Sequence, residues 1–147
     1  MRYSDMRKYS VFFLVVVNSL LLFCSCTNDG DIGDLYGRWQ LTDMQVSDST
    51  SQPDDLFLSF QSSVVFFSVS QYELHNATDY RGGFQHRGDS LIMKFVPLDG
   101  IGDNLSAELR NRLGWTDRNN VRLHIDQLNK SRLRLSRGND YWSFRAF

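Results

Sequence analysis

Cysteine is nearly absent from this chain of 147 residues, which contains only Cys24 and Cys26. Both lie at the end of an N-terminal apolar segment, so the rest of the sequence has no thiol and a disulfide-stabilised fold is excluded. Proline is also scarce, with two residues. The N-terminal apolar run, residues 11–23, has 13 positions, whereas a membrane-spanning helix needs about 20. A signal segment is therefore favoured over a transmembrane helix.

Excess charge and catalytic motifs are missing as well. The formal net charge of -1 provides no basic field for nucleic acid, and we expect no nucleic-acid partner. The three histidines, His75, His86 and His124, stand far apart in no metal-ligand spacing, so we expect neither a metal nor another cofactor. The sequence contains no Gly-x-Ser-x-Gly nucleophile elbow and no phosphate-binding glycine loop. It does not predict an enzyme.

The composition is that of one folded domain. Hydrophobic residues make up 41% of the chain and aromatic residues 14%, which is enough to build a core. A length of 147 residues fits a single core and leaves no room for two.

The N-terminus has the order of a signal peptide. The basic residues Arg2, Arg7 and Lys8 precede the apolar run. The run ends in Phe23-Cys24-Ser25-Cys26, which resembles a bacterial lipobox, where a small residue precedes a cysteine that is lipidated and becomes residue one. Ser25 and Cys26 match this pattern, while Phe23 stands where it prefers leucine. The alternative is an ordinary cleaved signal peptide with two incidental cysteines.

The lipobox resemblance implies a signal peptide at residues 1–25 and a membrane anchor through lipid on Cys26. It also implies a location in the bacterial cell envelope, at the outer membrane, on its periplasmic or external face. Residues 26–34 are rich in Asp, Gly and Asn after the cysteine and predict a flexible tether. Removing residues 1–25 leaves 13 basic and 16 acidic residues, so the exported part is mildly acidic.

Residues 35–147 predict an all-β domain, because short runs rich in Val, Phe, Leu and Tyr alternate with turn signals. Leu133 and Leu135 alternate with Arg132 and Arg134, which puts the leucines on one buried face of an antiparallel sheet. Closure of such a meander into an up-and-down barrel removes its free edges, so we prefer a barrel to a sandwich. Eight strands are expected, at residues 37–46, 63–70, 72–76, 80–86, 90–96, 121–128, 132–136 and 140–146.

Two connections are long. Residues 47–62 include Pro53, which favours a short helical turn over 53–58. Residues 97–120 predict a helix between strands five and six, because Leu105, Leu109 and Leu113 recur every four residues. Asp103 or Asn104 can cap its start and Gly114 can end it.

The topology predicts where these segments lie. Both long connections are odd-numbered in the meander, so they gather at one end of the barrel. The tether enters at the other end, and the two long segments therefore point away from the membrane.

The chain resembles a lipocalin-like (calycin) barrel at Gly37-Arg38-Trp39 in the first strand and Phe144-Arg145 in the last. It is particularly similar to the small lipocalin-like lipoproteins of Bacteroidota. This resemblance implies that Trp39 closes the barrel floor and that Arg145 packs across its indole. Typical lipocalins carry their large helix after the last strand, whereas here the helix is expected between strands, so the resemblance implies no particular ligand.

Two functions are open at this point. The first is a ligand-binding barrel for a small apolar or lipid-like molecule. The second is a non-enzymatic module that contacts another envelope protein and whose barrel is filled with side chains. The inward parity of strands 63–70 and 140–146 also stays open, because both faces carry apolar residues. The residues expected in the pocket or at its rim are Leu56, Phe57, Phe84, Phe95, Leu109 and Trp115.

Overall fold

A computed structural model describes residues 28–95, 105–117 and 120–147 of the chain. The chain divides into two compact units, residues 1–30 and residues 31–147. The second unit contains the whole described hydrophobic core, from Leu35 to Phe144. Because this unit has a core of its own, it can fold without the preceding residues. The predicted signal peptide and Cys26 lie outside the described residues.

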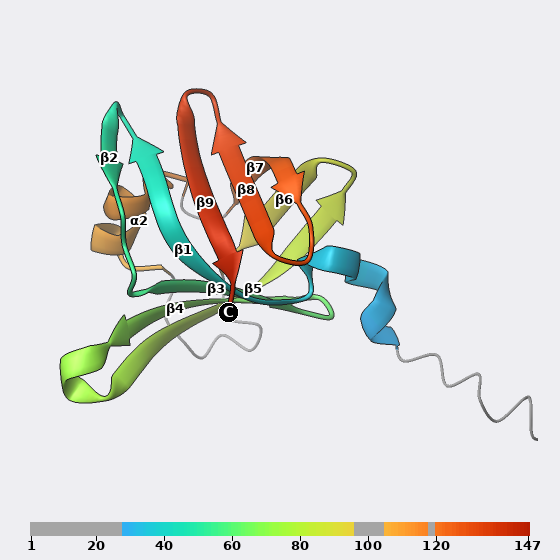
Figure 1. The fold of residues 1–147 in the computed structure, drawn as a ribbon, viewed down its shortest axis with the longest axis horizontal. Coiled ribbons are helices and arrows are strands. Elements are labelled where there is room, and N and C mark those ends of the chain that lie inside the picture. The colour runs from blue at the N-terminus through green and yellow to red at the C-terminus, as the bar shows by residue number, and fades with distance from the viewer. Residues whose placement is uncertain (1–27, 96–104, 118–119) are drawn as a thin grey trace, which may run out of the picture. The chain divides into compact units, whose positions relative to one another are not determined.

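The second unit is a closed antiparallel barrel of eight strands with one helix between its fifth and sixth strands (Figure 1). Strand β9 pairs with β1 and closes the barrel, while β2 pairs only with β1 and forms the outer arm of a hairpin. The strands are β1 (Gly37–Val46), β2 (Ser49–Ser51), β3 (Leu56–Gln61), β4 (Val64–Gln71), β5 (Asn76–Arg87), β6 (Ser90–Lys94), β7 (Val121–Leu128), β8 (Arg132–Arg137) and β9 (Asp140–Ala146). The described helical segments are η1 (Asn28–Leu35), η2 (Tyr72–Leu74) and α2 (Ala107–Leu113).

The predicted architecture is confirmed, but two of its strands are not those expected. Residues 72–76 and 80–86 are not two strands: the first stretch is η2 with a turn at His75, and the second is part of the continuous strand β5. The helical turn expected over 53–58 is wrong, because residues 56–61 form β3 between β1 and β4. The expected total was still eight, because β5 was predicted as two strands and β3 was not predicted.

The inward face follows the alternation of side chains along the strands, except where the pairing shifts. Leu133 and Leu135 are buried, as predicted, and the same alternation of apolar and polar residues in the sequence of β7 places Leu123 and Ile125 on the buried face. On β4 and β9, whose parity was open, the buried residues are Val65, Phe67, Trp142 and Phe144. In β1 the pairing with β9 shifts between Leu41 and Asp43, and this bulge at Thr42 lets both Leu41 and Met44 face inward.

Helix α2 begins and ends with local caps. The Ser106 hydroxyl accepts a hydrogen bond from the Leu109 amide at 3.1 Å, so Ser106 is the N-cap, whereas the expected caps Asp103 and Asn104 lie outside the described residues. Gly114 ends the helix at φ 69°, as predicted. A β-carbon on Gly114 would lie 2.6 Å from Val46 Cγ1, so glycine also permits the close approach of α2 to β1.

The two ends of the barrel differ. We call the end that carries the connections 47–55, 72–75, 95–120 and 138–139 the rim, and the opposite end the floor. Helix α2 lies at the rim beside the β1–β2 hairpin (Figure 1). Residues 47–55 and the described residues of 95–120 are therefore at one end, as predicted, whereas the rest of the expected long connection 47–62 forms β3 and runs to the floor. Within the described ranges, no helix is long and apolar enough to cross a membrane.

Residues just before β1 cover the floor. Leu35 is fully buried, and its carbonyl oxygen accepts a hydrogen bond of 3.0 Å from Trp39 Nε1. The amide of Tyr36 donates to the carbonyl of Gly33 at 3.1 Å. The segment expected to be an irregular tether thus ends in the 3₁₀ helix η1, which is kinked at Gly33.

Candidate functional site

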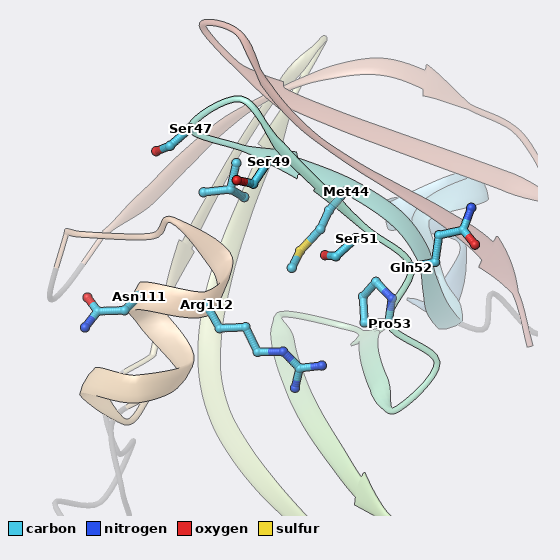
Figure 2. A pocket seen from close by; sticks show the side chains of 9 residues that line it. Met44, Ser47, Ser49, Ser51, Gln52, Pro53, Asn111 and Arg112 are labelled. Atoms are coloured by element: carbon cyan, nitrogen blue, oxygen red, sulfur yellow. The ribbon is translucent and has the colours of Figure 1, made fainter.

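A groove of about 540 Å³ opens at the rim between α2 and the inner face of the β1–β2 hairpin (Figure 2). We call it the rim groove. Its lining comes from three segments: the hairpin, the link that follows it, and α2. The lining residues are Met44, Val46, Ser47, Ser49, Ser51, Gln52, Pro53, Asn111 and Arg112.

The register of the hairpin explains which side chains face the groove. Met44 pairs with Ser51 and Val46 pairs with Ser49. Directly opposed residues in an antiparallel pair share one face, so the serines of β2 lie on the same face as the inward residues of β1. Thr50 lies on the other face because side chains alternate along a strand.

The tip of the hairpin is strained and held in place. Ser47 and Asp48 both have positive φ, 50° and 66°, which two-residue hairpin turns of the primed types require. The Ser47 amide donates a hydrogen bond of 2.9 Å to Asp140 Oδ1, and Gln45 Nε2 donates one of 3.2 Å to the carbonyl of Asn139. The β8–β9 turn therefore fixes the position of the hairpin over α2.

We expect Asp48→Gly to raise the free energy of unfolding by about 0.5–1 kcal/mol, because glycine adopts positive φ without the penalty that a β-carbon imposes. Asp48→Ala is the control, since it removes the same carboxylate but keeps the β-carbon. Urea denaturation midpoints measure both variants. An equal gain for both would assign the effect to charge rather than to the backbone.

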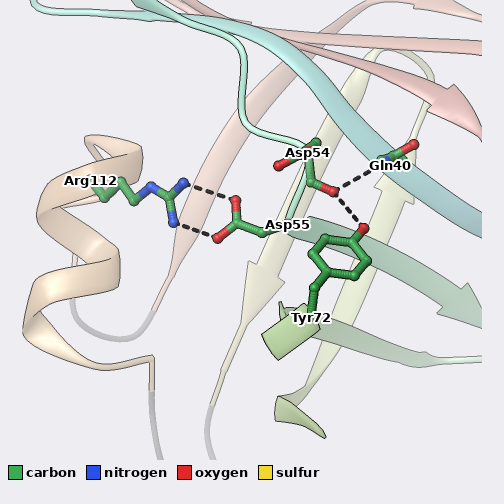
Figure 3. Close-up of polar contacts among 5 residues, drawn as sticks. All are labelled: Gln40, Asp54, Asp55, Tyr72 and Arg112. Atoms are coloured by element: carbon green, nitrogen blue, oxygen red, sulfur yellow. Dashed lines mark hydrogen bonds and ion pairs between the residues drawn. The ribbon is translucent and has the colours of Figure 1, made fainter. Parts of the chain in front are cut away.

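Arg112, which lines the rim groove, is paired with Asp55. Arg112 Nη1 and Nη2 each donate a hydrogen bond of 2.9 Å to the two carboxylate oxygens of Asp55 (Figure 3). This hydrogen bond with Asp55, together with the negative charges of Asp55, Glu108 and Asp54, raises the pKa of Arg112 above its ordinary value, although partial burial opposes the rise. Arg112 therefore stays charged. The pair is solvent-accessible, so it contributes at most about 1 kcal/mol to stability.

The link that carries Asp55 is anchored by its backbone. The carbonyl of Asp54 accepts hydrogen bonds from Gln40 Nε2 at 2.8 Å and from the Tyr72 hydroxyl at 3.1 Å (Figure 3). The carbonyl of Asp55 accepts a hydrogen bond of 2.7 Å from the amide of Ser70. Strands β1 and β4 thus fix the acidic side of the Arg112–Asp55 pair.

The chemistry of the rim groove is amphiphilic. Met44, Val46 and Pro53 provide apolar surface, while the remaining lining residues offer hydroxyl, amide and guanidinium groups. Arg112 is the one charged residue among the lining residues, and its ion pair with Asp55 offsets its charge, which favours a neutral ligand. Among the described residues no three His, Cys, Asp or Glu side chains gather as a metal site would require.

The barrel interior beside the rim is occupied by aromatic rings. Trp115 lies with its ring centroid 5.5 Å from that of Phe67, 5.9 Å from Trp142 and 6.3 Å from Phe95. At most 2% of each of these four side chains is exposed. Trp142 Nε1 donates to the carbonyl of Leu113 at 3.1 Å, whereas Trp115 Nε1 has no acceptor within the described part of the chain.

The residues that the sequence placed in a pocket do not line the rim groove. Leu56, Phe95, Leu109 and Trp115 belong to the barrel core. Phe84 is partly buried against Phe60, with ring centroids 5.0 Å apart. Phe57 faces outward, where the Arg38 guanidinium lies 4.3 Å from its ring centroid and Phe147 packs edge-on at 5.0 Å.

The expected stack of Arg145 on Trp39 does not form. Trp39 pairs with Ala146, and Arg145 pairs with Gln40, the next residue along β1. Because neighbouring residues on a strand face opposite sides, Arg145 lies outside the barrel while Trp39 lies inside. The Arg145 Nε and Nη2 atoms donate to Gln40 Oε1 at 2.9 and 2.7 Å.

A closed antiparallel barrel of eight strands that opens with Gly-x-Trp defines a lipocalin-like protein. The family described as "Lipocalin-like domain" matches residues 21–147, and the chain therefore belongs to this family. No curated protein matches the chain significantly.

Two solved structures share the fold. One is a lipocalin-like protein from Bacteroides uniformis, with 23% sequence identity and a TM-score of 0.64 over 78% of this chain and 100% of that one. The other is a protein from Bacteroides eggerthii, with 21% identity and a TM-score of 0.65 over 77% of this chain and 99% of that one. Barrels of this family generally serve binding rather than catalysis.

Proposed function

We propose that the mature protein is a lipid-anchored binding protein of the bacterial cell envelope that holds a small amphiphilic ligand in the rim groove. The observation that carries the proposal is the rim groove itself. There, polar side chains from β2 and α2 surround an apolar surface at the rim of a lipocalin-like barrel. Convergent polar groups in a mostly preformed concavity are the usual features of a small-molecule site.

The envelope part of the proposal rests on the N-terminal sequence. Arg2, Arg7 and Lys8 precede an apolar run that ends at Ser25-Cys26, the order of a lipoprotein signal. The lipid on Cys26 would hold the protein at the outer membrane. The rim groove would then face the aqueous side, because the chain enters the barrel at the floor.

The rim groove is favoured over the barrel interior because of what already lies inside. The aromatic cluster of Trp115, Phe67, Phe95 and Trp142 occupies the rim half of the barrel. Leu109 and Leu113 of α2 are buried in the same core. A ligand inside the barrel would have to displace α2 or these rings, whereas a ligand in the rim groove displaces only solvent.

One observation favours a second candidate, an apolar ligand inside the barrel. Trp115 Nε1 is buried and lacks an acceptor among the described residues. A buried donor without a partner costs about 1–3 kcal/mol, which a ligand carbonyl or ether oxygen could recover. This candidate predicts an apolar ligand with one hydrogen-bond acceptor.

Native mass spectrometry of the protein purified gently from its own envelope tests both candidates. Ser51→Trp fills the rim groove from an exposed strand position and should abolish the mass of a co-purifying small molecule. Thr50→Trp is the matched control, because the same bulk then points away from the groove. Trp115→Phe removes the indole N–H from the interior, together with part of the ring volume, and keeps an aromatic ring there.

The outcomes separate the two sites. Loss of the ligand in Ser51→Trp alone supports the rim groove. Retention in Ser51→Trp with loss in Trp115→Phe places the ligand inside the barrel and overturns the proposed site. Absence of any co-purifying molecule from the wild-type protein contradicts small-ligand binding and leaves the interaction module with a filled barrel as the better description.

A further inference from the structure

Four basic side chains gather where β1, β8 and β9 meet the floor, and we call this group the basic corner. Its members are Arg38, Lys130, Arg132 and Arg145. Neighbouring strand ends bring them together, since β9 pairs with both β1 and β8. None of the four forms an ion pair with another described residue. Residues 36–40, 128–133 and 144–147, which build this corner, contain no acidic side chain.

Arg132 and Arg145 give the basic corner a position that an external anion would stabilise. They are directly opposed in the register of β8 and β9, and both are exposed. Like charges in this position repel each other, so the sheet bears a cost that an anion between them would remove. Both line an open groove of about 540 Å³ that also presents the hydroxyl-bearing residues Thr42, Ser131 and Ser143.

The charge of the rim connections has the opposite sign. Their described residues contain six acidic side chains and two basic ones. The acidic residues are Asp48, Asp54, Asp55, Glu73, Glu108 and Asp117, and the basic ones are Arg110 and Arg112. The rim margin is therefore acidic, and at the floor the basic corner is distinct from the exposed Asp34 before β1 and Asp89 between β5 and β6. A negatively charged surface would attract the basic corner rather than the rim.

Two exposed aromatic side chains accompany the basic corner. Tyr36 is 49% exposed and Phe147 is 68% exposed, and the other large apolar side chains exposed to this degree, Tyr72 and Leu74, lie in η2 at the rim. Phe147 lies beside Arg38, whose guanidinium is 5.1 Å from its ring centroid, and its amide donates to the Arg38 carbonyl at 2.9 Å. Aromatic and basic residues side by side are typical of protein surfaces that rest on a membrane interface.

We propose that the basic corner docks on a membrane surface that carries anionic phospholipid headgroups, with headgroup phosphates at Arg132 and Arg145. The chain also keeps the floor close to a membrane: Leu35, which is buried, lies nine positions after Cys26, a span of at most about 32 Å. This inference rests on the proposed lipid anchor, because that anchor would hold the floor next to the bilayer.

The test uses residues 31–147 without lipid, because this unit contains the whole described core and the measurement then reports the basic corner alone. Sedimentation compares vesicles of phosphatidylcholine with vesicles of phosphatidylcholine and phosphatidylglycerol. We expect binding only to the mixed vesicles, and weaker binding as salt screens the charges. A failure of lipidation at Cys26 cannot change this result, so the two proposals can fail separately.

Arg132→Glu is the decisive variant. It turns the opposed Arg132 and Arg145 into an oppositely charged pair, which preserves the fold, and it should weaken binding to the mixed vesicles by about tenfold or more. Arg122→Glu changes the net charge equally from an exposed position on β7, outside the basic corner, and should weaken binding by about twofold or less. The thermal midpoint of each variant checks that it is folded.

Three results would overturn the proposal. The first is equal binding of the wild-type domain to vesicles with and without phosphatidylglycerol, and the second is no binding to either. The third is an equal loss of binding in Arg132→Glu and Arg122→Glu, which would make the attraction a matter of net charge and not of the basic corner.

Discussion

Cys26→Ala is expected to abolish the incorporation of fatty acid and to release the protein from membranes or leave it as an unprocessed precursor. Cys24→Ala is expected to change neither property. The reason is the residue before each cysteine: the small Ser25 precedes Cys26, whereas the bulky Phe23 precedes Cys24. Metabolic labelling with a radioactive fatty acid, followed by fractionation of the envelope, measures both effects.

The fold should be unaffected by the Cys26→Ala change, because the described core lies entirely in residues 31–147. Lipid chains contribute about 0.8 kcal/mol per buried methylene group, so their loss outweighs whatever attraction the basic corner provides. An unchanged thermal midpoint together with loss of label would assign the effect to the anchor. If the Cys26→Ala protein still takes up label, the anchor has been assigned to the wrong residue.

Alternation predicted the strands best where one face of the sheet meets water. In β7 and β8, arginine, histidine and aspartate separate the apolar residues, and the inward set of Leu123, Leu133 and Leu135 could be named from the sequence. The same rule failed in β3. There Phe57 faces outward but is buried, because Arg38 and Phe147 cover it. Both faces of β3 therefore carry apolar residues, and Leu56-Phe57-Leu58 shows no alternation that would indicate a strand.

The rim groove could not be predicted because one of its walls, β2, carries no hydrophobic signal. All three residues of β2 are exposed, and a polar stretch of serine and threonine is typical of a loop. Its other wall comes from α2, which reaches the link after the hairpin through a contact between Arg112 and Asp55, 57 positions apart in the sequence. The helix itself was predictable from its leucine spacing, but its partner was not.

The arginine positions show a second limit of sequence reasoning. Gly-x-Trp at the start of β1 located Trp39 at the barrel floor. There its indole nitrogen donates a hydrogen bond to the carbonyl of Leu35. The partner expected for Trp39 from the last strand was Arg145. The register differs from this expectation by one residue, so Ala146 opposes Trp39. A one-residue difference moves a side chain to the other face of a sheet, which changes an interior cation into an exterior one.

Leu135→Ala is expected to lower the free energy of unfolding by about 2–5 kcal/mol. Leu135 is fully buried, and its strand neighbours in the register are Ile125 on β7 and Trp142 on β9. Truncation to alanine removes buried methyl groups and leaves a cavity that the indole of Trp142 cannot close, because Trp142 Nε1 is bonded to the carbonyl of Leu113 at 3.1 Å. Urea denaturation followed by tryptophan fluorescence measures the loss.

Arg134→Ala is the matched control, because the same strand carries it to the solvent face next to Leu135. Its guanidinium lies 4.1 Å from the ring centroid of Tyr141 and its Nε lies 3.8 Å from Asp126 Oδ2, and 44% of the side chain is exposed. Contacts of this kind at a surface contribute about 1 kcal/mol or less. A loss for Arg134→Ala as large as that for Leu135→Ala would contradict the inward register of β8, and with it the closure of the barrel between β7 and β9.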